Sequence, residues 1–243
     1  MLIDYLLRRA DDALILGHRL SEWTGHAPMM EEDMALANMA LDLIGQARSL
    51  YAYAAEIGGG SEDSLAYLRR EGAYKNLLLV EQPNGDFAMT ILRQFFYSAF
   101  ADPFWRASMP STDATLAAVA AKAEKEMAYH LRHSAEWVVR LGDSTPEARR
   151  RIEAAITKLW PYTGEMFEAD EAGLVESKIA VDPALLAADW RDTVAQVFAR
   201  ATLSVPRDGW MQTGGRHGRH SEHLGHILSE LQYMQRTFPG ATW

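Results

Sequence analysis

The sequence has 243 residues, a formal net charge of −9, an apolar fraction of 48% and no cysteine. The negative charge disfavours a nucleic-acid-binding protein, whose affinity would come largely from Lys and Arg against phosphates. Without cysteine the chain has no disulfide and no thiolate ligand, so a bound metal would need His and carboxylates. No apolar run approaches the ~20 residues that span a bilayer, and we expect a soluble, cytoplasmic protein without nucleic-acid or membrane partners.

Helical periodicity extends over almost the whole sequence, and no convincing strand alternation is present. The first predicted helix covers about residues 3–23. The second begins near Pro28 and ends at the glycines of residues 58–60. Such a helix is much longer than the average, and a similar length is predicted for residues 111–141. Helices this long favour a bundle over globin-like packing.

Local signals define the remaining elements. A short helical stretch is predicted from Ser61, and a longer helix from Asp86 to about Phe100. This helix is expected to end near Pro103, since proline lacks the N–H donor that a helix interior needs. Ser144 is the predicted N-cap of a later helix.

The signal at this later helix is "STPE", with Pro146 in the first turn and Glu147 in the capping-box position. Asp182-Pro183 repeats the same kind of start signal. No linker is long or polar enough to divide the chain. We therefore expect one helical domain over residues 1–243, with an all-α, ferritin-like four-helix-bundle core and additional helices.

The segment "RHGRHSEHLGHILSELQ" at residues 216–232 holds half of the histidines. These are His217, His220, His223 and His226. Residues three apart drift ~60° around a helix, so four of them cannot converge on one ion. His220 is predicted inside the apolar face of the helix and His223 at its border. Single buried or interface histidines are the favoured interpretation; a pair, or Glu222 with His226, would be the alternative metal site.

The segment "EKEMAYHLRHSAEW" contains a second group of candidate ligands. His130 is predicted on the inner face of its helix, and Glu126 at the edge of that face beside His133. A histidine and a carboxylate one turn apart on an inward face are what a bundle needs to bind an ion. The simpler alternative is a core histidine whose hydrogen bond is satisfied by a nearby carboxylate.

A carboxylate-bridged di-iron centre takes a Glu from each of two helices and a Glu-x-x-His motif from each of two others. Here Asp42 stands where the motif needs Glu, but Gly45 occupies the histidine position. Glu126 is followed by Tyr129 at the histidine position. Asp11, or its neighbour, would supply the first helix. Both ligand histidines are therefore missing from the pattern.

The predicted helix over residues 86–100 carries Arg93 and Gln94 where a di-iron centre would need a carboxylate. Three carboxylates with an arginine nearby poorly balance the +4 charge of two ferrous ions. Such a bundle should instead close its polar interior with ion pairs and hydrogen bonds. An alternative for Asp42 is a solvent-facing stripe with Asn38 and Gln46.

Several long segments resemble the structural C subunits of the multicomponent phenylacetyl-CoA epoxidases of bacterial phenylacetate degradation. The segments are "EWTGHAPMMEEDMALANMALDLIGQARSLYAYAAE", "NLLLVEQPNGDFAMTILRQFF", "EKEMAYHLRHS" and "GGRHGRHSEHLGHILSELQYMQRTFPGATW". The resemblance covers nearly the whole chain. It implies a ferritin-like bundle that has lost its iron ligands and binds no cofactor itself.

The resemblance also implies the partners. They are the homologous di-iron catalytic subunit, the other epoxidase subunits, and a reductase that brings electrons from NADPH through FAD and iron–sulfur centres. The assembled complex would insert one oxygen atom of O2 into the ring of phenylacetyl-CoA. His220, Glu222 and His223 belong to the family-like ending, and we expect them to orient the last helix or contact the sister subunit.

Two rival hypotheses keep the metal in this chain. One is an autonomous di-iron oxidase that uses Asp42, Glu126 and His130 with unconventional ligands. The other is a zinc- or nickel-binding helical protein built around residues 217–226. A self-paired dimer is the expected state when the partner subunit is absent. The methionines of "MMEEDMALANMA" are predicted as internal core residues.

Overall fold

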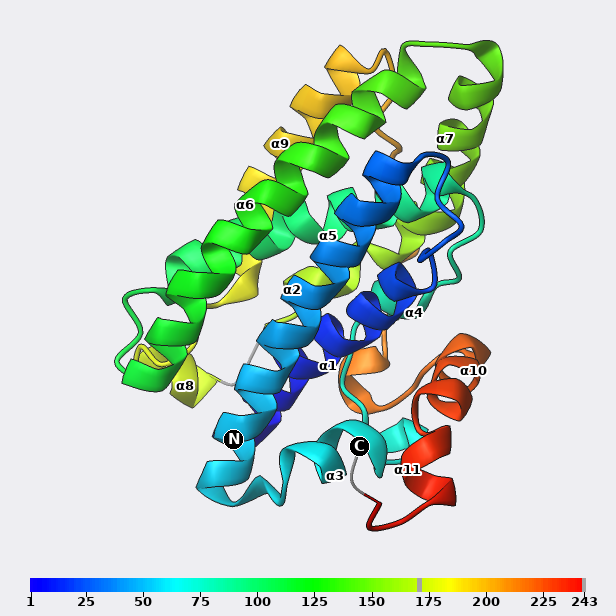
Figure 1. The fold of residues 1–243 in the computed structure, drawn as a ribbon. Helices are drawn as coiled ribbons and strands as arrows, with labels where there is room; N and C mark the ends of the chain where they lie inside the picture. Colours follow the sequence, from blue (N-terminus) through cyan, green and yellow to red (C-terminus); the bar gives the residue numbers. More distant parts are fainter. Residues whose placement is uncertain (170–171, 242–243) are drawn as a thin grey trace. The chain divides into compact units, whose positions relative to one another are not determined.

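The computed structural model describes residues 1–169 and 172–241. Its regular structure in these ranges is helical throughout, without a strand, which confirms the predicted all-α class (Figure 1). Contacts between Cα atoms divide the chain into two compact units. The first unit is Met1–Pro83 with Thr213–Trp243, and the second is Asn84–Gln212. The expectation of one single domain stays a prediction.

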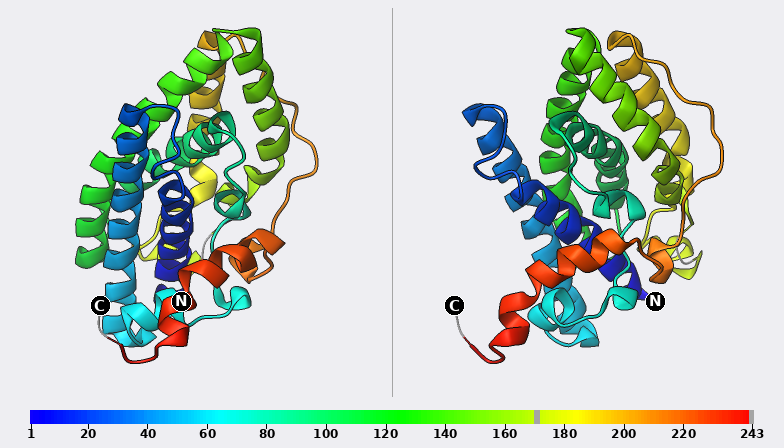
Figure 2. Two further views of the ribbon diagram at one scale, coloured as in Figure 1. Left: turned by 45° about the vertical axis from the view of Figure 1, so that its right-hand side comes forward. Right: turned by 90° about the vertical axis from the view of Figure 1, so that its right-hand side faces the viewer.

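The first unit is built on a pair of long helices, α1 (Leu2–Ser21) and α2 (Met30–Ala54). Figure 2 shows the two helices side by side in both views. Acidic residues fill the first turn of α2, where their negative charges interact favourably with the positive end of the helix dipole. Gly17 permits the close approach of the pair, because a Cβ there would lie 3.2 Å from the carbonyl oxygen of Ala40.

Short elements complete the first unit. After a turn that ends α2, the chain forms α3 (Glu62–Tyr67), capped by Ser61, and α4 (Leu78–Glu81). The C-terminal segment returns to this unit as α10 (Glu222–Leu231) and α11 (Tyr233–Thr237). The unit is therefore assembled from both ends of the chain.

The second unit is built on α5 (Phe87–Ser108) and α6 (Ala114–Gly142). Nearly every residue of α5 is buried, which makes it the central helix of the unit. The elements α7 (Pro146–Leu159), α8 (Ala172–Glu176) and α9 (Ala187–Arg200) complete it. Each unit thus contains one pair of long helices of the kind from which ferritin-like bundles are built.

Aromatic side chains form the core of the second unit. The Phe96 ring lies 5.7 Å from that of Trp190 and 6.1 Å from that of Phe198, between ring centroids. The indole N–H of Trp190 donates to the carbonyl oxygen of Phe96 at 3.0 Å, so its polar atom is satisfied in the core.

The structure corrects three predicted helix ends in the second unit. α5 does not stop at Pro103 but continues to Ser108, because the following Phe104 and Trp105 are 1% and 2% exposed and their packing outweighs the lost hydrogen bond. The N-cap of α6 is Asp113, and that of α7 is Thr145 instead of Ser144. The side chain of each cap accepts a hydrogen bond from the backbone N–H of the residue three positions later.

The last helix also differs from its prediction. It begins at Glu222, with Ser221 as the N-cap, so His220 precedes the helix and does not lie on its apolar face. It is interrupted after Leu231, at the boundary with α11. Among the described residues, no helix combines the length and the apolar character that crossing a bilayer would require.

Candidate functional site

Two adjacent aspartates lie in the interior of the first unit, in the middle of α1. Asp11 is 0% exposed and Asp12 is 1% exposed. Buried carboxylates are tolerated only when they are paired and hydrogen-bonded, so the partners of this pair decide what it can do.

Asp11 is held by three groups. Its two oxygens contact the guanidinium of Arg69, with 3.0 Å between Nη1 and Oδ2. The hydroxyl of Tyr51 donates to Oδ1 at 2.5 Å, and the backbone N–H of Lys75 donates to Oδ2 at 2.7 Å. Burial raises the pKa of Tyr51 well above 10, so the phenol keeps the proton that it donates. The Asp11 carboxylate is neutralised and satisfied within the protein.

Asp12 has a partner from the other end of the chain. Arg216 binds it in two places, Nη1 to Oδ1 at 3.0 Å and Nη2 to Oδ2 at 2.8 Å. The N–H of Leu77 donates to Oδ1 at 2.8 Å. Arg216 Nη1 also donates to the carbonyl oxygens of Arg8 and Lys75, at 3.0 and 2.9 Å. Such a two-pronged pair is both strong and geometrically specific.

Glu81 and His220 form the third buried pair, with side chains 0% and 3% exposed. Nδ1 of His220 lies 2.9 Å from Oε2 of Glu81, and Nε2 lies 3.0 Å from the carbonyl oxygen of Tyr74. Both neighbours are acceptors, and only the imidazolium can donate from both nitrogens. Burial lowers the pKa of His220, but the hydrogen bonds to Glu81 and Tyr74 outweigh burial and raise it above 6.5.

The second oxygen of Glu81 accepts the N–H of Ser221 at 2.7 Å, and Asn76 donates to Oε2 at 3.0 Å. We call the three pairs, Asp11–Arg69, Asp12–Arg216 and Glu81–His220, the buried ionic network. It connects α1 to the segment of residues 69–81 and to the C-terminal segment. Its chemistry is that of a cross-link, since every carboxylate in it already has a cation.

The other candidates of the first unit are not members of these three pairs. Asp42 and Gly45 are half-buried on α2. Glu222 is exposed in the first turn of α10, and His223 is half-buried. His217 and His226 are exposed. Of the four clustered histidines, only His220 has both ring nitrogens hydrogen-bonded in the interior.

In the second unit, His130 is fully buried, as its helical position predicts. Its Nδ1 lies 3.2 Å from Nε2 of Gln94, which also lies 3.0 Å from the Ser98 hydroxyl. Glu126 pairs with Lys122, with 3.5 Å between Oε1 and Nζ. Tyr129 is 38% exposed, so this side chain points outward and not into the core.

These placements do not fit a di-iron centre in this chain. Both oxygens of Asp11 are bound to protein donors, Gly45 has no side chain, and Tyr129 lies at the surface. Within the described ranges, no three His, Asp or Glu side chains are grouped so that they could hold a metal ion. The assignment of Asp11, Asp42, Gly45, Glu126 and Tyr129 to former iron-ligand positions stays a prediction.

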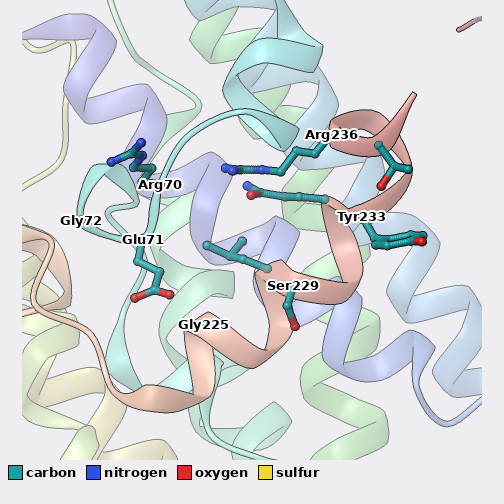
Figure 3. Close-up of a pocket in the computed structure, with 10 residues that line it drawn as sticks. Arg70, Glu71, Gly72, Gly225, Ser229, Tyr233 and Arg236 are labelled. Atoms are coloured by element: carbon teal, nitrogen blue, oxygen red, sulfur yellow. The ribbon is translucent and has the colours of Figure 1, made fainter. Parts of the chain in front are cut away.

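A pocket of about 660 Å³ adjoins the network (Figure 3). Arg236 extends from α11 across it, toward the turn that carries Arg70 and Glu71. Arg236 Nη2 donates to the carbonyl oxygen of Arg69 at 3.1 Å. Gln232, in the wall of the pocket, donates to the same oxygen and to the Tyr74 hydroxyl, both at 3.0 Å. The C-terminal helices are thus anchored on the segment that also carries the network.

The sequence reasoning missed the cationic partners. It named Asp11 but not Arg69, and it discussed the segment around Arg216 only for its histidines. One signal was available: two adjacent aspartates in the middle of a helix, followed by the apolar residues 13–16, need cations if they are buried. The motif "GGRHG" places an arginine among glycines that allow close backbone approach. A Cβ on Gly215 would lie 2.2 Å from the carbonyl oxygen of Asn76.

Comparisons with known proteins identify the family of the chain. The family model described as "Phenylacetic acid catabolic protein" matches residues 1–243. The chain is 51% identical, over 242 residues, to the C subunit of the 1,2-phenylacetyl-CoA epoxidase of Escherichia coli (strain K12), with 98% of each chain covered. The resemblance stated from the sequence is confirmed: the chain belongs to the phenylacetic acid catabolic protein family.

Proposed function

We propose that this chain is the non-catalytic C subunit of a phenylacetyl-CoA epoxidase complex. It stabilises and positions a homologous di-iron catalytic subunit in aerobic phenylacetate catabolism. The observation that carries the proposal is the 51% identity to the C subunit of the Escherichia coli epoxidase, which extends over 98% of both chains. Identity at this level and coverage supports the same place in the same kind of assembly.

The non-catalytic part of the proposal is supported by the buried ionic network. Recruiting Asp11 or Asp12 as an iron ligand would leave Arg69 or Arg216 as a buried cation without its counter-charge. Breaking a buried pair in this way costs about 3–5 kcal/mol. A metal would therefore have to compete with a partner that the fold already supplies.

The cofactors belong to the partners in this proposal. The catalytic subunit holds the two irons, and the reductase supplies two electrons from NADPH through FAD and iron–sulfur centres. One atom of O2 enters the aromatic ring of phenylacetyl-CoA and the other leaves as water. The role of this chain is to provide a folded surface for the catalytic subunit, without contacting the reacting atoms.

The proposal is tested by expressing the complex with and without this chain. The mass of the intact assembly and phenylacetyl-CoA-dependent NADPH oxidation are measured. Without this chain, we expect the catalytic subunit to be lost from the soluble fraction and the epoxidase activity to be lost with it. Full activity and stability of the catalytic subunit alone would contradict the proposed role.

One substitution distinguishes a supporting subunit from an autonomous di-iron oxidase. Glu126→Gln changes a residue that an autonomous di-iron oxidase would use as a ligand. We expect the assembled complex to keep its turnover within about twofold, because Glu126 contacts Lys122 and no reacting group in this proposal. Near two irons per chain in the isolated wild type, lost in the variant together with oxygen consumption, would establish the rival function instead.

A further inference from the structure

Some exposed side chains of the first unit were not predicted from the sequence as surface or site residues. Met30 is 72% exposed and Met34 59%, so the prediction that the methionines here are core residues is wrong for these two, although Met39 is fully buried. Arg70 and Arg236 are exposed in the lining of the pocket that Figure 3 shows. These two arginines give the pocket positive charges in a chain whose net charge is −9.

The pocket has the size of a small-molecule site. Its volume of about 660 Å³ lies within the range of ~300–1,000 Å³ that is usual for ligand clefts. One wall is the turn at residues 70–72, and the other is formed by α10 and α11 (Figure 3). Gln232 and Arg236 of the second wall both bind the carbonyl oxygen of Arg69, beside the turn. The protein itself therefore holds the two walls together.

Two guanidinium groups serve one end of the pocket. Figure 3 shows the side chain of Arg236 extending toward the turn that carries Arg70. Nη2 of Arg236 donates to the carbonyl oxygens of residues 68 and 69, which fixes the guanidinium without neutralising it. In the described ranges the structure pairs neither arginine with a carboxylate. Since arginine binds phosphate through parallel N–H donors, this end can hold an anion between two cations.

The rest of the lining differs in charge and polarity. Glu71 points away from Arg70 and toward Gly225 (Figure 3). This approach depends on the glycine, because a Cβ on Gly225 would lie 2.6 Å from Oε1 of Glu71. The carboxylate is an acceptor for hydroxyl groups, as acidic side chains are for ribose in dinucleotide sites. Leu228 and Tyr233 of the lining add apolar surface on which a planar ring can lie.

This combination of groups distinguishes between classes of ligand. A small dicarboxylate would use the two arginines but would be repelled by Glu71, and a metal ion would be repelled by the arginines. A nucleotide uses all three kinds of group, since its phosphates need cations, its ribose needs an acceptor and its base needs a flat apolar surface. The lining therefore favours a ligand with phosphate at one end and sugar hydroxyls at the other.

We propose that this pocket binds a free nucleoside diphosphate. Arg70 and Arg236 bind its phosphates, and Glu71 accepts hydrogen bonds from its ribose. Coenzyme A contains the same adenosine diphosphate, but it carries an additional phosphate on the ribose, which Glu71 would repel. The free nucleotide is therefore the better ligand. This inference does not depend on the proposed function, because it concerns binding to the isolated chain.

Isothermal titration calorimetry of the full chain tests the ligand class, with ADP, adenosine, inorganic pyrophosphate and coenzyme A as probes. We expect ADP to bind with a dissociation constant below ~1 mM. Adenosine and pyrophosphate should each bind roughly tenfold more weakly than ADP, because each lacks one half of the contacts. Coenzyme A should also bind more weakly than ADP. Added salt should weaken ADP binding, since the arginines are exposed and their charges are screened.

Two substitutions test the assigned contacts. Arg70→Gln should weaken ADP binding roughly tenfold or more, because a charged phosphate contact is lost. Arg48→Gln is the matched control, since it removes an exposed arginine of the same unit that does not line the pocket, and it should change the affinity less than about twofold. Glu71→Gln should weaken ADP binding but strengthen pyrophosphate binding, because it removes a repulsive charge. Circular dichroism verifies that the variants keep their helices.

Four results would overturn the inference. The first is a wild type that binds no ADP at millimolar concentration, and the second is an Arg70→Gln variant that binds ADP as well as the Arg48→Gln variant does. Pyrophosphate binding as tight as that of ADP would reduce the pocket to a simple anion site. Tighter binding of coenzyme A than of ADP would assign the pocket to the nucleotide part of an acyl-CoA and not to a free nucleotide.

Discussion

Arg216 and Asp12 lie 204 residues apart in the sequence and form a two-pronged ion pair inside the first unit. Neither side chain is more than 6% exposed. The pair fastens the C-terminal segment to the middle of α1. Because both charges have left water, each depends on the other more strongly than a surface pair would.

Removing one member of this pair should lower the free energy of unfolding more than removing both. We expect Arg216→Met to lower the free energy of unfolding by about 3–5 kcal/mol, because the Asp12 carboxylate stays buried without its cation. The double variant Asp12→Leu/Arg216→Met should recover part of this loss. Urea unfolding followed by circular dichroism measures both. Arg219→Met, at an exposed neighbouring position, is the control and should change stability by less than about 0.5 kcal/mol.

The imidazolium of His220 should make stability depend on pH. The folded state raises its pKa above 6.5, so its contribution is fully present below pH 6.5 and is lost as the pH rises through the folded-state pKa. Within that window we expect the free energy of unfolding to fall by up to ~1.4 kcal/mol per pH unit. The charged groups that act on the pKa of His220 are Glu81 and Asp11, and the carbonyl oxygen of Tyr74 accepts its second ring N–H.

The His220→Gln variant isolates this contribution. It cannot become charged, so its stability should show a flatter dependence on pH from 6.5 upward than the wild type. Chemical unfolding at several pH values provides the comparison. Parallel curves for the two proteins would mean that His220 is neutral in the folded state.

Gly142 should not tolerate a methyl group. A Cβ there would lie 2.4 Å from the carbonyl oxygen of Ala201 and 2.9 Å from its Cβ. We expect Gly142→Ala to destabilise the protein by about 1–3 kcal/mol through forced backbone displacement. Thermal unfolding measures the effect. Gly209→Ala is the control, because a Cβ at Gly209 would meet no atom within 4 Å.

Metal removal should leave the isolated chain unchanged. The buried ionic network neutralises its carboxylates with Arg69, Arg216 and His220, so its stability requires no cation from solution. We expect the same melting temperature after growth in iron-replete medium and after exhaustive treatment with a chelator. A decrease of several degrees on chelation, restored by ferrous iron, would contradict this prediction and weaken the proposed function.

The all-α class was predictable because apolar residues recur at helical spacing over long segments, and this pattern determines the class largely without tertiary information. The starts of α5 and α3 were also readable, since Asp86 and Ser61 are both good N-caps. Pro103 misled the prediction because the packing of Phe104 lies outside any local signal. The start of α10 was predicted too early. His220 lies ahead of the N-cap Ser221, and its pair with Glu81, not helical periodicity, fixes its position.

The polar interior was predictable in kind but not in detail. Counting carboxylates and missing histidines predicted ion pairs in the polar interior, and Asp11, one of the three carboxylates considered there, lies in such a pair with Arg69. Its partners Arg69 and Tyr51 are 58 and 40 residues away, and nothing in local spacing relates them. Burial of His130 followed from the helical wheel, whereas its contact with Gln94 required the fold.

The first unit is made from the two ends of the chain, and this imposes an order on its synthesis. Asp12 and Glu81 leave the ribosome long before Arg216 and His220 have been translated. The second unit is continuous and can be completed first, as segments generally fold when they emerge. We therefore expect the nascent protein to fold from its middle, and its amino-terminal helices to be locked only after Arg216 and His220 have emerged from the ribosome.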